Sequence, residues 1–327
     1  MTQTSRAKAK TMRAVALDKF GGPETLQIQS VPIPDIGPKD VLIRTEAAGV
    51  GAWDPFEREG GFVEMMGRKP KFPYVLGTDG AGIIAEVGKE VSDFKMGDRV
   101  YALELANPKG GFYAEYAAIN ADNVSKIPGQ LTMEQAAVLP SDAVTALTGL
   151  EKVLRLKRGD SLMIFGASGG IGHLAIQLAK RLGARVFAVA SGSDGVALAK
   201  KLGADSVIDG KGDNVLEAAK EFAPEGIDAA LVTAGGAKTD RVLSAIRRGG
   251  RVAYPNGVMP EPHGPSGVQI EAYDGEANSA LIRRLNSLIE AGPFEVHVDR
   301  AFPLEEVVKA QKALDEHHLG KIALRVQ

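Results

Sequence analysis

Residues 162–175 read Leu-Met-Ile-Phe-Gly-Ala-Ser-Gly-Gly-Ile-Gly-His-Leu-Ala, and this stretch decides the fold. An apolar run at 162–165 enters a glycine-rich turn, and an amphipathic pattern leaves the turn near Ile171. A strand, a glycine turn and a helix in that order place backbone N–H groups at a helix N-terminus, where they can hold a diphosphate. The stretch therefore predicts a dinucleotide-binding turn. A glycine turn with only a packing role is the alternative.

The register of this turn stays open by a few positions. The string from Gly170 to Ala175 fits the spacing G-x-G-x-x-A, whereas the end of the apolar run starts the turn at Gly166. Because the chain has 39 glycines, a match to that string alone carries little weight. The position between an apolar run and a helical pattern makes the prediction specific.

An alternating series of apolar runs and helical patterns surrounds the turn. We expect strands at 161–165, 185–190, 206–209, 227–232 and 251–254. We expect helices at 171–182, 195–202, 214–222 and 239–247. Almost continuously apolar strands that alternate with helices predict a doubly wound parallel sheet covered on both faces.

The chain before residue 128 has a different rhythm. Short β-prone runs, separated by Gly, Pro and Asp, stand at 13–17, 26–29, 40–44, 82–87, 99–103 and 113–119. Evenly spaced strands with turn signals are typical of a barrel or a sandwich. At the other end, a helix at 304–317 precedes a strand at 321–326, which we expect to pair with this all-β part. The fold class is therefore α/β, with a β-barrel and a doubly wound parallel sheet in one chain.

Composition excludes several functional classes. The length of 327 residues suggests two domains, and 39 basic against 41 acidic side chains give a net charge of −2. This balance speaks against nucleic acid or a membrane surface as a partner. The chain has no cysteine, and its five histidines contain no pair spaced i, i+4, so we expect no metal site.

The first residues and the longest apolar runs bear on location. Residues 1–11 are basic and lack an apolar segment, so we expect a flexible tail and not a signal peptide. No apolar run approaches the roughly 20 residues of a membrane span. Both observations favour a cytoplasmic protein.

The expected strand at 185–190 ends in Ser191, Gly192 and Ser193. Proteins that bind NAD place a carboxylate at this point, where it accepts hydrogen bonds from the adenosine ribose. Small residues leave room for a 2′-phosphate, whereas a carboxylate would repel it. The sequence therefore favours NADP(H). In the alternative, Ser193 only caps the N-terminus of the next helix.

Further motifs occur in a fixed order along the chain. They are Ala47-Ala48-Gly49-Val50 with Asp54, Leu76-Gly77-Thr78-Asp79-Gly80-Ala81-Gly82, Gly97-Asp98-Arg99-Val100, the turn at 166–172, Leu202-Gly203-Ala204-Asp205 and Gly320-Lys321. With this set the chain resembles the zinc-independent quinone oxidoreductases of the medium-chain dehydrogenase/reductase superfamily, the zeta-crystallin-like group. Thr78-Asp79 stand where zinc-dependent relatives carry His-Glu.

The resemblance implies a GroES-like catalytic domain made of residues 12–128 and 274–327. It implies a Rossmann dinucleotide-binding domain of residues 129–273. The expected flexible tail of residues 1–11 lies before the first of these domains. It also implies NADP(H) as the cofactor, a quinone or enone as the small-molecule substrate, and a homodimer.

The resemblance also implies cofactor-binding residues. The diphosphate turn would be Ser168, Gly169, Gly170 and Ile171, and the adenosine end would lie on Ser191, Gly192 and Ser193. Asn256 and Gly257 would lie near the nicotinamide-side ribose, Phe56 would face the cofactor, and Lys321 would reach its phosphates. The chain departs from the family pattern at Gly51, Gly195 and Gly210, where relatives often carry Asn, Lys and an aromatic residue or His.

Hydride transfer needs positioning more than catalytic side chains. Trp53 offers a flat apolar wall and an indole N–H to a substrate pocket, and Thr145 offers a hydroxyl to the nicotinamide carboxamide. Core packing is the alternative for both. Asp54 and Arg58 are spaced to pair on one helical turn, and Tyr74 is either a phenol donor or a core residue. His317 and His318 are interpreted as a helix C-terminus.

These residues predict an NADPH-dependent oxidoreductase that transfers a hydride to a quinone or to the C=C bond of an α,β-unsaturated carbonyl without zinc. Two other hypotheses stay open. One is a non-catalytic NADPH-binding protein with a structural or regulatory role. The other is a zinc-dependent alcohol dehydrogenase, which would require a metal site that the sequence does not offer.

Overall fold

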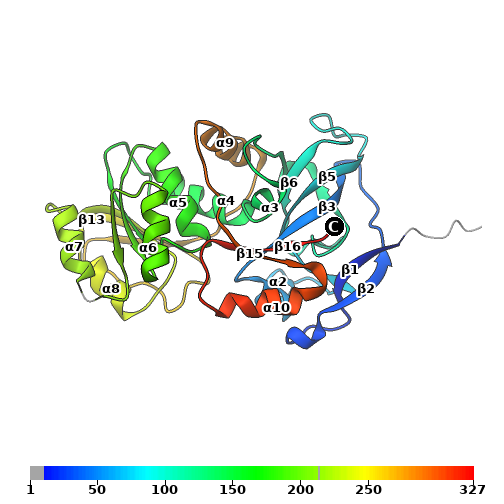
Figure 1. Cartoon of the computed structure of the whole chain (residues 1–327), viewed down its shortest axis with the longest axis horizontal. Helices are drawn as coiled ribbons and strands as arrows, with labels where there is room; N and C mark the ends of the chain where they lie inside the picture. Colours follow the sequence, from blue (N-terminus) through cyan, green and yellow to red (C-terminus); the bar gives the residue numbers. More distant parts are fainter. Residues whose placement is uncertain (1–10, 213) are drawn as a thin grey trace, which may run out of the picture.

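The computed structural model describes residues 11–212 and 214–327, which form three sheets (Figure 1). The six-stranded sheet has the strand order β11-β10-β9-β12-β13-β14, and all neighbouring strands are parallel. Its strands are β9 (Ser161–Phe165), β10 (Arg185–Ala190), β11 (Ser206–Asp209), β12 (Ile227–Val232), β13 (Ile246–Pro255) and β14 (Gln269–Tyr273). The strand order reverses between β9 and β12, and ligands of such sheets bind at the carboxyl ends beside that point.

Helices connect these strands and occupy the left half of Figure 1. They are α5 (Gly170–Arg181), α6 (Gly192–Lys201), α7 (Val215–Phe222) and α8 (Ala237–Leu243). The strands β9 and β12 are almost completely buried, as the near-continuous apolar pattern predicts. The doubly wound parallel sheet is confirmed.

The other two sheets lie in the right half of Figure 1. A seven-stranded sheet has the path β15-β16-β3-β5-β6-β8, with β7 paired to β3, and a three-stranded sheet has the order β2-β1-β4. The strands are β1 (Thr11–Leu17), β2 (Gln27–Pro32), β3 (Asp40–Val50), β4 (Tyr74–Val75), β5 (Asp79–Val87), β6 (Arg99–Leu103), β7 (Tyr116–Asn120), β8 (Val124–Lys126), β15 (Val298–Pro303) and β16 (Lys321–Arg325). The terminal strand β16 pairs antiparallel with β3, so the expected return of the C-terminus to the all-β part is confirmed.

Short helices join and flank the sheets. They are η1 (Pro23–Thr25), α1 (Asp54–Arg58), α2 (Gly61–Met65), η2 (Ala121–Asn123), α3 (Met133–Ala137), α4 (Pro140–Thr148), the π-helical η3 (Gly149–Val153), α9 (Ser279–Glu290), η4 (Leu304–Glu306), α10 (Val307–Lys312) and η5 (Ala313–Asp315). Among the described residues no helix is both long enough and apolar enough to cross a lipid bilayer.

The structure corrects several expected elements. The helix expected at 239–247 ends at Leu243, because residues from Ile246 onward pair with β12 as the start of β13. The single helix expected at 304–317 is instead divided into η4, α10 and η5. The strand expected at 40–44 continues to Val50, since its second half pairs with both β5 and β16. The expected domain limits at 128/129 and 273/274 stay a prediction.

One contact joins the two kinds of architecture directly. Gly169, in the glycine turn, forms a parallel bridge with Gly320, just before β16. The Gly320 N–H donates to the carbonyl oxygen of Ser168 at 2.8 Å. The start of the last strand therefore lies against the turn that follows β9.

Candidate functional site

The glycine turn runs from Gly166 to Gly169 and ends where α5 begins at Gly170. Gly166 has a φ of +85°, which a residue with a Cβ rarely adopts. Gly169 holds the N-cap position with extended backbone, and within the described chain no side chain caps α5. The first N–H groups of a 12-residue helix are therefore left for a ligand.

The glycines of the turn serve two purposes. A Cβ on Gly172 would overlap the carbonyl oxygen of Gly166, so Gly172 is required for the close approach of α5 to the turn. A Cβ on Gly169 would meet only that same oxygen, at 3.5 Å, which is ordinary contact. Packing therefore explains Gly172 and leaves the glycine at position 169 to another requirement, such as backbone access for a phosphate.

The adenosine end predicted from the sequence lies at the end of β10. Ser191 and Ser193 are exposed and Gly192, with a φ of +79°, is half-buried. Ser168 accepts a long hydrogen bond of 3.4 Å from the Ser191 N–H. The predicted N-cap at Ser193 is wrong, because α6 begins at Gly192 and Ser191 holds the N-cap position without a side-chain bond.

Charged groups surround Gly192, and the sequence analysis did not single out Asp209 among them. Asp209, at the end of β11, accepts hydrogen bonds from the N–H groups of Gly192 at 3.2 Å and Lys211 at 3.0 Å, which lower the pKa of its carboxyl. Asp194 bonds His317 at 2.9 Å. Asp209 could have been found from the sequence as an acidic residue at the end of the strand next to β10. The contact between Asp194 and His317 could not, because the two residues are 123 positions apart. His317 therefore contacts α6, and the helix C-terminus interpretation of it is wrong.

A buried ion cluster lies directly beneath the turn. The Lys321 ammonium is 3.0 Å from Asp142 Oδ2, and the two side chains are 5% and 4% exposed. A Cβ on Gly170 would overlap Asp142 Oδ2 and lie 2.9 Å from Lys321 Cδ. The Asp142–Lys321 pair therefore packs directly against the backbone of the turn at Gly170. Lys321 thus lies at the turn, as predicted, but its ammonium contacts Asp142 and lies 4.4 Å from the centre of the Trp53 ring.

Two further carboxylates complete this cluster. Asp79 Oδ1 accepts from the Ser141 hydroxyl at 2.5 Å and from the Ser141 N–H at 3.2 Å, and burial raises the pKa of Asp79 to about 7. Asp54 Oδ2 accepts from the Tyr113 hydroxyl at 2.5 Å and from the Gly51 N–H at 2.9 Å, and burial raises its pKa to about 6. Burial lowers the pKa of Lys321, but the charges of Asp142, Asp79 and Asp54 together outweigh this effect, so the pKa is raised.

Residues beside the cluster correct two side-chain hypotheses. Asp54 bonds Tyr113 and Gly51, while Arg58 bonds Gln311 and Glu59, so the expected Asp54–Arg58 pair does not form. Tyr74 is buried and donates to Glu57 at 2.9 Å, which makes it a core residue. Burial, followed by the nearby Asp54 charge, raises the pKa of Glu57 to about 8.

The residues predicted for the nicotinamide side come from separate elements. Trp53 is half-buried before α1, and Phe56 is 48% exposed and packs edge-on against Phe62. Thr145 is half-buried in the middle of α4, where its hydroxyl faces Gly275. Asn256 and Gly257 follow β13 and are exposed, and the Asn256 N–H donates to the carbonyl oxygen of Tyr273. In the structure Trp53 contacts Lys321. The cofactor and substrate roles of Phe56, Thr145, Asn256 and Gly257 stay predictions.

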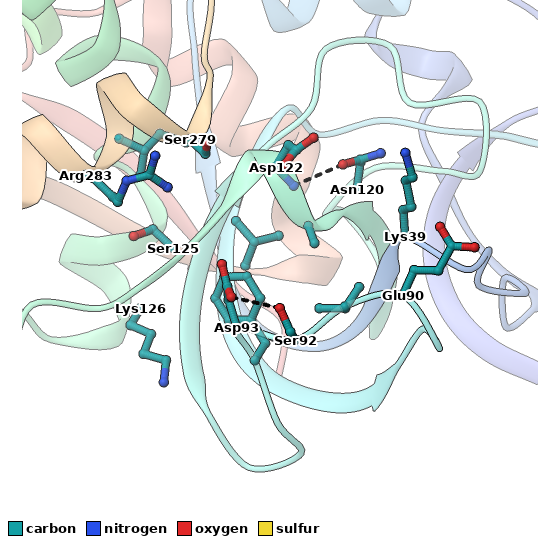
Figure 2. A pocket seen from close by; sticks show the side chains of 15 residues that line it. Lys39, Glu90, Ser92, Asp93, Asn120, Asp122, Ser125, Lys126, Ser279 and Arg283 are labelled. Atoms are coloured by element: carbon teal, nitrogen blue, oxygen red, sulfur yellow. Dashed lines mark hydrogen bonds between the residues drawn. The ribbon is translucent and has the colours of Figure 1, made fainter.

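A pocket of about 480 Å³ lies elsewhere. Figure 2 shows it among Lys39, Glu90, Asp122, Lys126 and Arg283, at the edge of the all-β part beside α9. Charges of both signs line it, and no predicted site residue does. The candidate site is therefore the glycine turn with the ion cluster and not this pocket.

Comparison with known proteins agrees with the geometry of the turn. The family model described as an alcohol dehydrogenase GroES-like domain matches residues 37–129, and the model described as a zinc-binding dehydrogenase matches residues 170–266. A quinone oxidoreductase of Lama guanicoe is 32% identical over 331 residues, which cover 96% of this chain and 98% of the relative. The chain belongs to the medium-chain dehydrogenase/reductase family.

Other members of this family have related names. The chloroplastic NADPH-dependent alkenal/one oxidoreductase of Arabidopsis thaliana is 31% identical, over 96% of this chain and 80% of the relative. A crystal structure of an NAD-dependent alcohol dehydrogenase superposes with a TM-score of 0.87 at 28% identity, over 97% of this chain and 100% of the other. The family resemblance is confirmed, and the protein is an oxidoreductase that uses a nicotinamide cofactor and a small-molecule substrate.

The zinc named in one family description does not fit the donor groups of this family member. The chain has no cysteine, and the described residues contain no group of three His, Asp or Glu side chains that could hold a metal ion. At the position after Gly77, Thr78 and Asp79 are buried, with Asp79 committed to Ser141. We derive no chemistry through zinc.

The turn of this family member predicts a contrast between two glycines. Gly172→Ala should lower the free energy of unfolding by about 2–3 kcal/mol, because its Cβ overlaps a backbone oxygen. Gly169→Ala, the matched control, should unfold within about 0.5 kcal/mol of wild type and should bind dinucleotide more weakly. Urea unfolding and cofactor titration measure the two effects. Equal stability of the two variants would contradict the packing role of Gly172.

His173 predicts a pH dependence of stability. Burial lowers its pKa to about 4, and its Nδ1–H donates to Gly169 while Nε2 accepts from the His297 N–H. The neutral ring therefore stabilises the fold above about pH 6.5, and this contribution is lost as pH falls toward 4, by up to about 3 kcal/mol. The stability difference between wild type and His173→Asn should narrow over this range in urea unfolding. A difference independent of pH would refute this contribution.

Proposed function

We propose that the protein transfers a hydride from NADPH to a quinone or to the C=C bond of an α,β-unsaturated carbonyl, without zinc. The observation that carries the proposal is the uncapped N-terminus of α5 behind a glycine turn at the strand-order reversal. The names of the mammalian quinone oxidoreductase and the plant alkenal/one oxidoreductase support the acceptor class.

The residues of this chain suit an acceptor that needs little acid–base help. A reduced nicotinamide supplies the hydride, so the protein must position the acceptor and stabilise the charge that develops on its oxygen. Trp53 offers a flat, half-buried ring whose position is fixed by the Lys321 ammonium, 4.4 Å from the ring centre. Alcohol oxidation would demand a Lewis acid or a base to remove a hydroxyl proton.

NADPH is the proposed form of the cofactor because small residues occupy the end of β10. Ser191 and Ser193 are exposed, and no side chain of residues 191–193 exceeds a hydroxymethyl group. The nearby Asp194 is paired with His317, and Asp209 is engaged by the N–H groups of Gly192 and Lys211. These bonds lower the pKa values of both carboxylates and hold the ionised groups in place, and neither carboxylate belongs to residues 191–193, where an NAD site places its acid.

The first test is turnover. The purified protein should oxidise NADPH far faster than background with simple quinones or enals, and more slowly with NADH. Absorbance at the reduced-nicotinamide band follows the reaction. Tight NADPH binding with no turnover on any acceptor would favour the non-catalytic alternative, and stoichiometric zinc in the active protein would favour the alcohol dehydrogenase.

The second test concerns the adenosine end. Ser191→Asp should weaken NADPH binding by about tenfold or more through repulsion of the 2′-phosphate, while NADH binding stays within about threefold. Fluorescence titration with both cofactors gives the two dissociation constants. Unchanged NADPH affinity would show that the adenosine 2′-phosphate does not bind beside Ser191.

A homodimer and a cytoplasmic location complete the proposal. Both follow from the resemblance and composition, and sedimentation of the full chain tests the first.

A further inference from the structure

The ion cluster beneath the glycine turn has more acid than base. Three carboxylates, those of Asp54, Asp79 and Asp142, raise the pKa of the one ammonium of Lys321. Asp54, Asp79, Asp142 and Lys321 are each at most 5% exposed. The other charged or titratable groups that face the cluster are Arg58, Glu57 and Tyr113 beside Asp54, and His173 beside Asp142.

Two carboxylate oxygens in this cluster lack a partner. Within the described residues, Asp79 Oδ2 and Asp54 Oδ1 are buried and accept no hydrogen bond. An ionised buried carboxylate with one bare oxygen is costly, and a proton on that oxygen removes most of the cost. Burial accordingly raises the pKa of both groups, further for Asp79.

The cluster is separated from the proposed diphosphate site by one residue of backbone. Asp142 Oδ2 occupies the space where a Cβ on Gly170 would lie, and the stem of Lys321 lies beside it. A diphosphate on the amides of this turn brings two negative charges close to three carboxylates in a medium that screens poorly. If the Lys321 ammonium moved toward the diphosphate, Asp142 would lose its partner, and the cluster would again become more negative.

We infer that Asp79 takes up a proton from solvent when the dinucleotide binds and returns it when the dinucleotide leaves. The inference rests on the proposed function. Asp79 is favoured over Asp54 because Ser141 connects it directly to the start of α4, the helix that carries Asp142, whereas Asp54 is bonded to Tyr113 and Gly51.

Proton uptake is measured by titration calorimetry of the full chain with NADPH and with NADH near pH 8. The observed enthalpy is plotted against the ionisation enthalpy of HEPES, Tricine and Tris, and the slope gives protons bound per dinucleotide. Wild type should take up about half a proton, and Asp79→Asn should take up almost none. NADH has no titrating group in this pH range, so its slope reports protons bound by the protein alone. For NADPH, the quantity of interest is the difference in slope between wild type and Asp79→Asn.

Glu57→Gln is the matched control. Glu57 is also a buried acid with a raised pKa and an unpartnered oxygen, but it accepts from the Tyr74 hydroxyl and lies beside Asp54, at the edge of the cluster away from Asp142. This variant should keep the wild-type slope.

If Asp79→Asn does not fold, wild type tests proton uptake, because its dissociation constant for NADH should rise severalfold from about pH 7 to about pH 9. Ser141→Ala then tests the assignment, because loss of the hydroxyl bond raises the pKa of Asp79 and should move that rise to higher pH.

The outcomes separate this inference from the proposed function. Dinucleotide binding with a zero slope and a flat dissociation constant would overturn proton uptake and leave the proposed function standing. A wild-type slope in Asp79→Asn would assign the proton to another group and overturn the role of Asp79. No binding of either dinucleotide would overturn the proposed function itself.

Discussion

The contact between the glycine turn and the start of the last strand organises the whole site. The bridge from Gly169 to Gly320, with the 2.8 Å bond to the Ser168 carbonyl, fixes Lys321 under the turn. From there its ammonium reaches Asp142 and the Trp53 ring, which come from the middle and the beginning of the chain. Three distant segments thus meet where the backbone of the turn pairs with the start of the last strand.

That approach also explains why so much charge is buried here. A lone buried ammonium is unstable, and a lone buried carboxylate is as well, but grouping them around Lys321 offsets much of the desolvation cost. The arrangement is still unbalanced, with more carboxylates than cations and with bare oxygens on Asp54 and Asp79. In our account this imbalance is what makes the site respond to a phosphate on the other side of the turn.

Local patterns in the sequence predicted the parallel sheet, the turn and the return of the last strand. These features depend on apolar periodicity and glycine placement, which neighbouring residues reveal. The sequence did not predict that β13 begins at Ile246, because Arg247, Arg248 and two glycines give no strand pattern. Only the pairing of Ile246 with Ile227 of β12, followed by a shift in register, extends the strand to this point. The strands β14 and β15 were also not predicted, because most of their residues are exposed or half-buried and give no apolar pattern.

The candidate site divides in the same way. Ser168 to Ile171 and Ser191 to Ser193 follow directly from the strand ends of the sheet. The sequence did not predict that Asp54, Asp79, Asp142 and Lys321 form one cluster. These residues are far apart along the chain, and each resembles an ordinary surface charge. Asp209 was missed because the acid beside the end of β10 comes from the neighbouring strand.

A crystal of the full chain soaked with NADPH would show whether the glycine turn holds the dinucleotide. We expect diphosphate density within about 3 Å of the N–H groups at the start of α5, with Lys321 still beside the turn. Density for the nucleotide elsewhere, with the turn at residues 166–170 empty or closed by side chains, would contradict it.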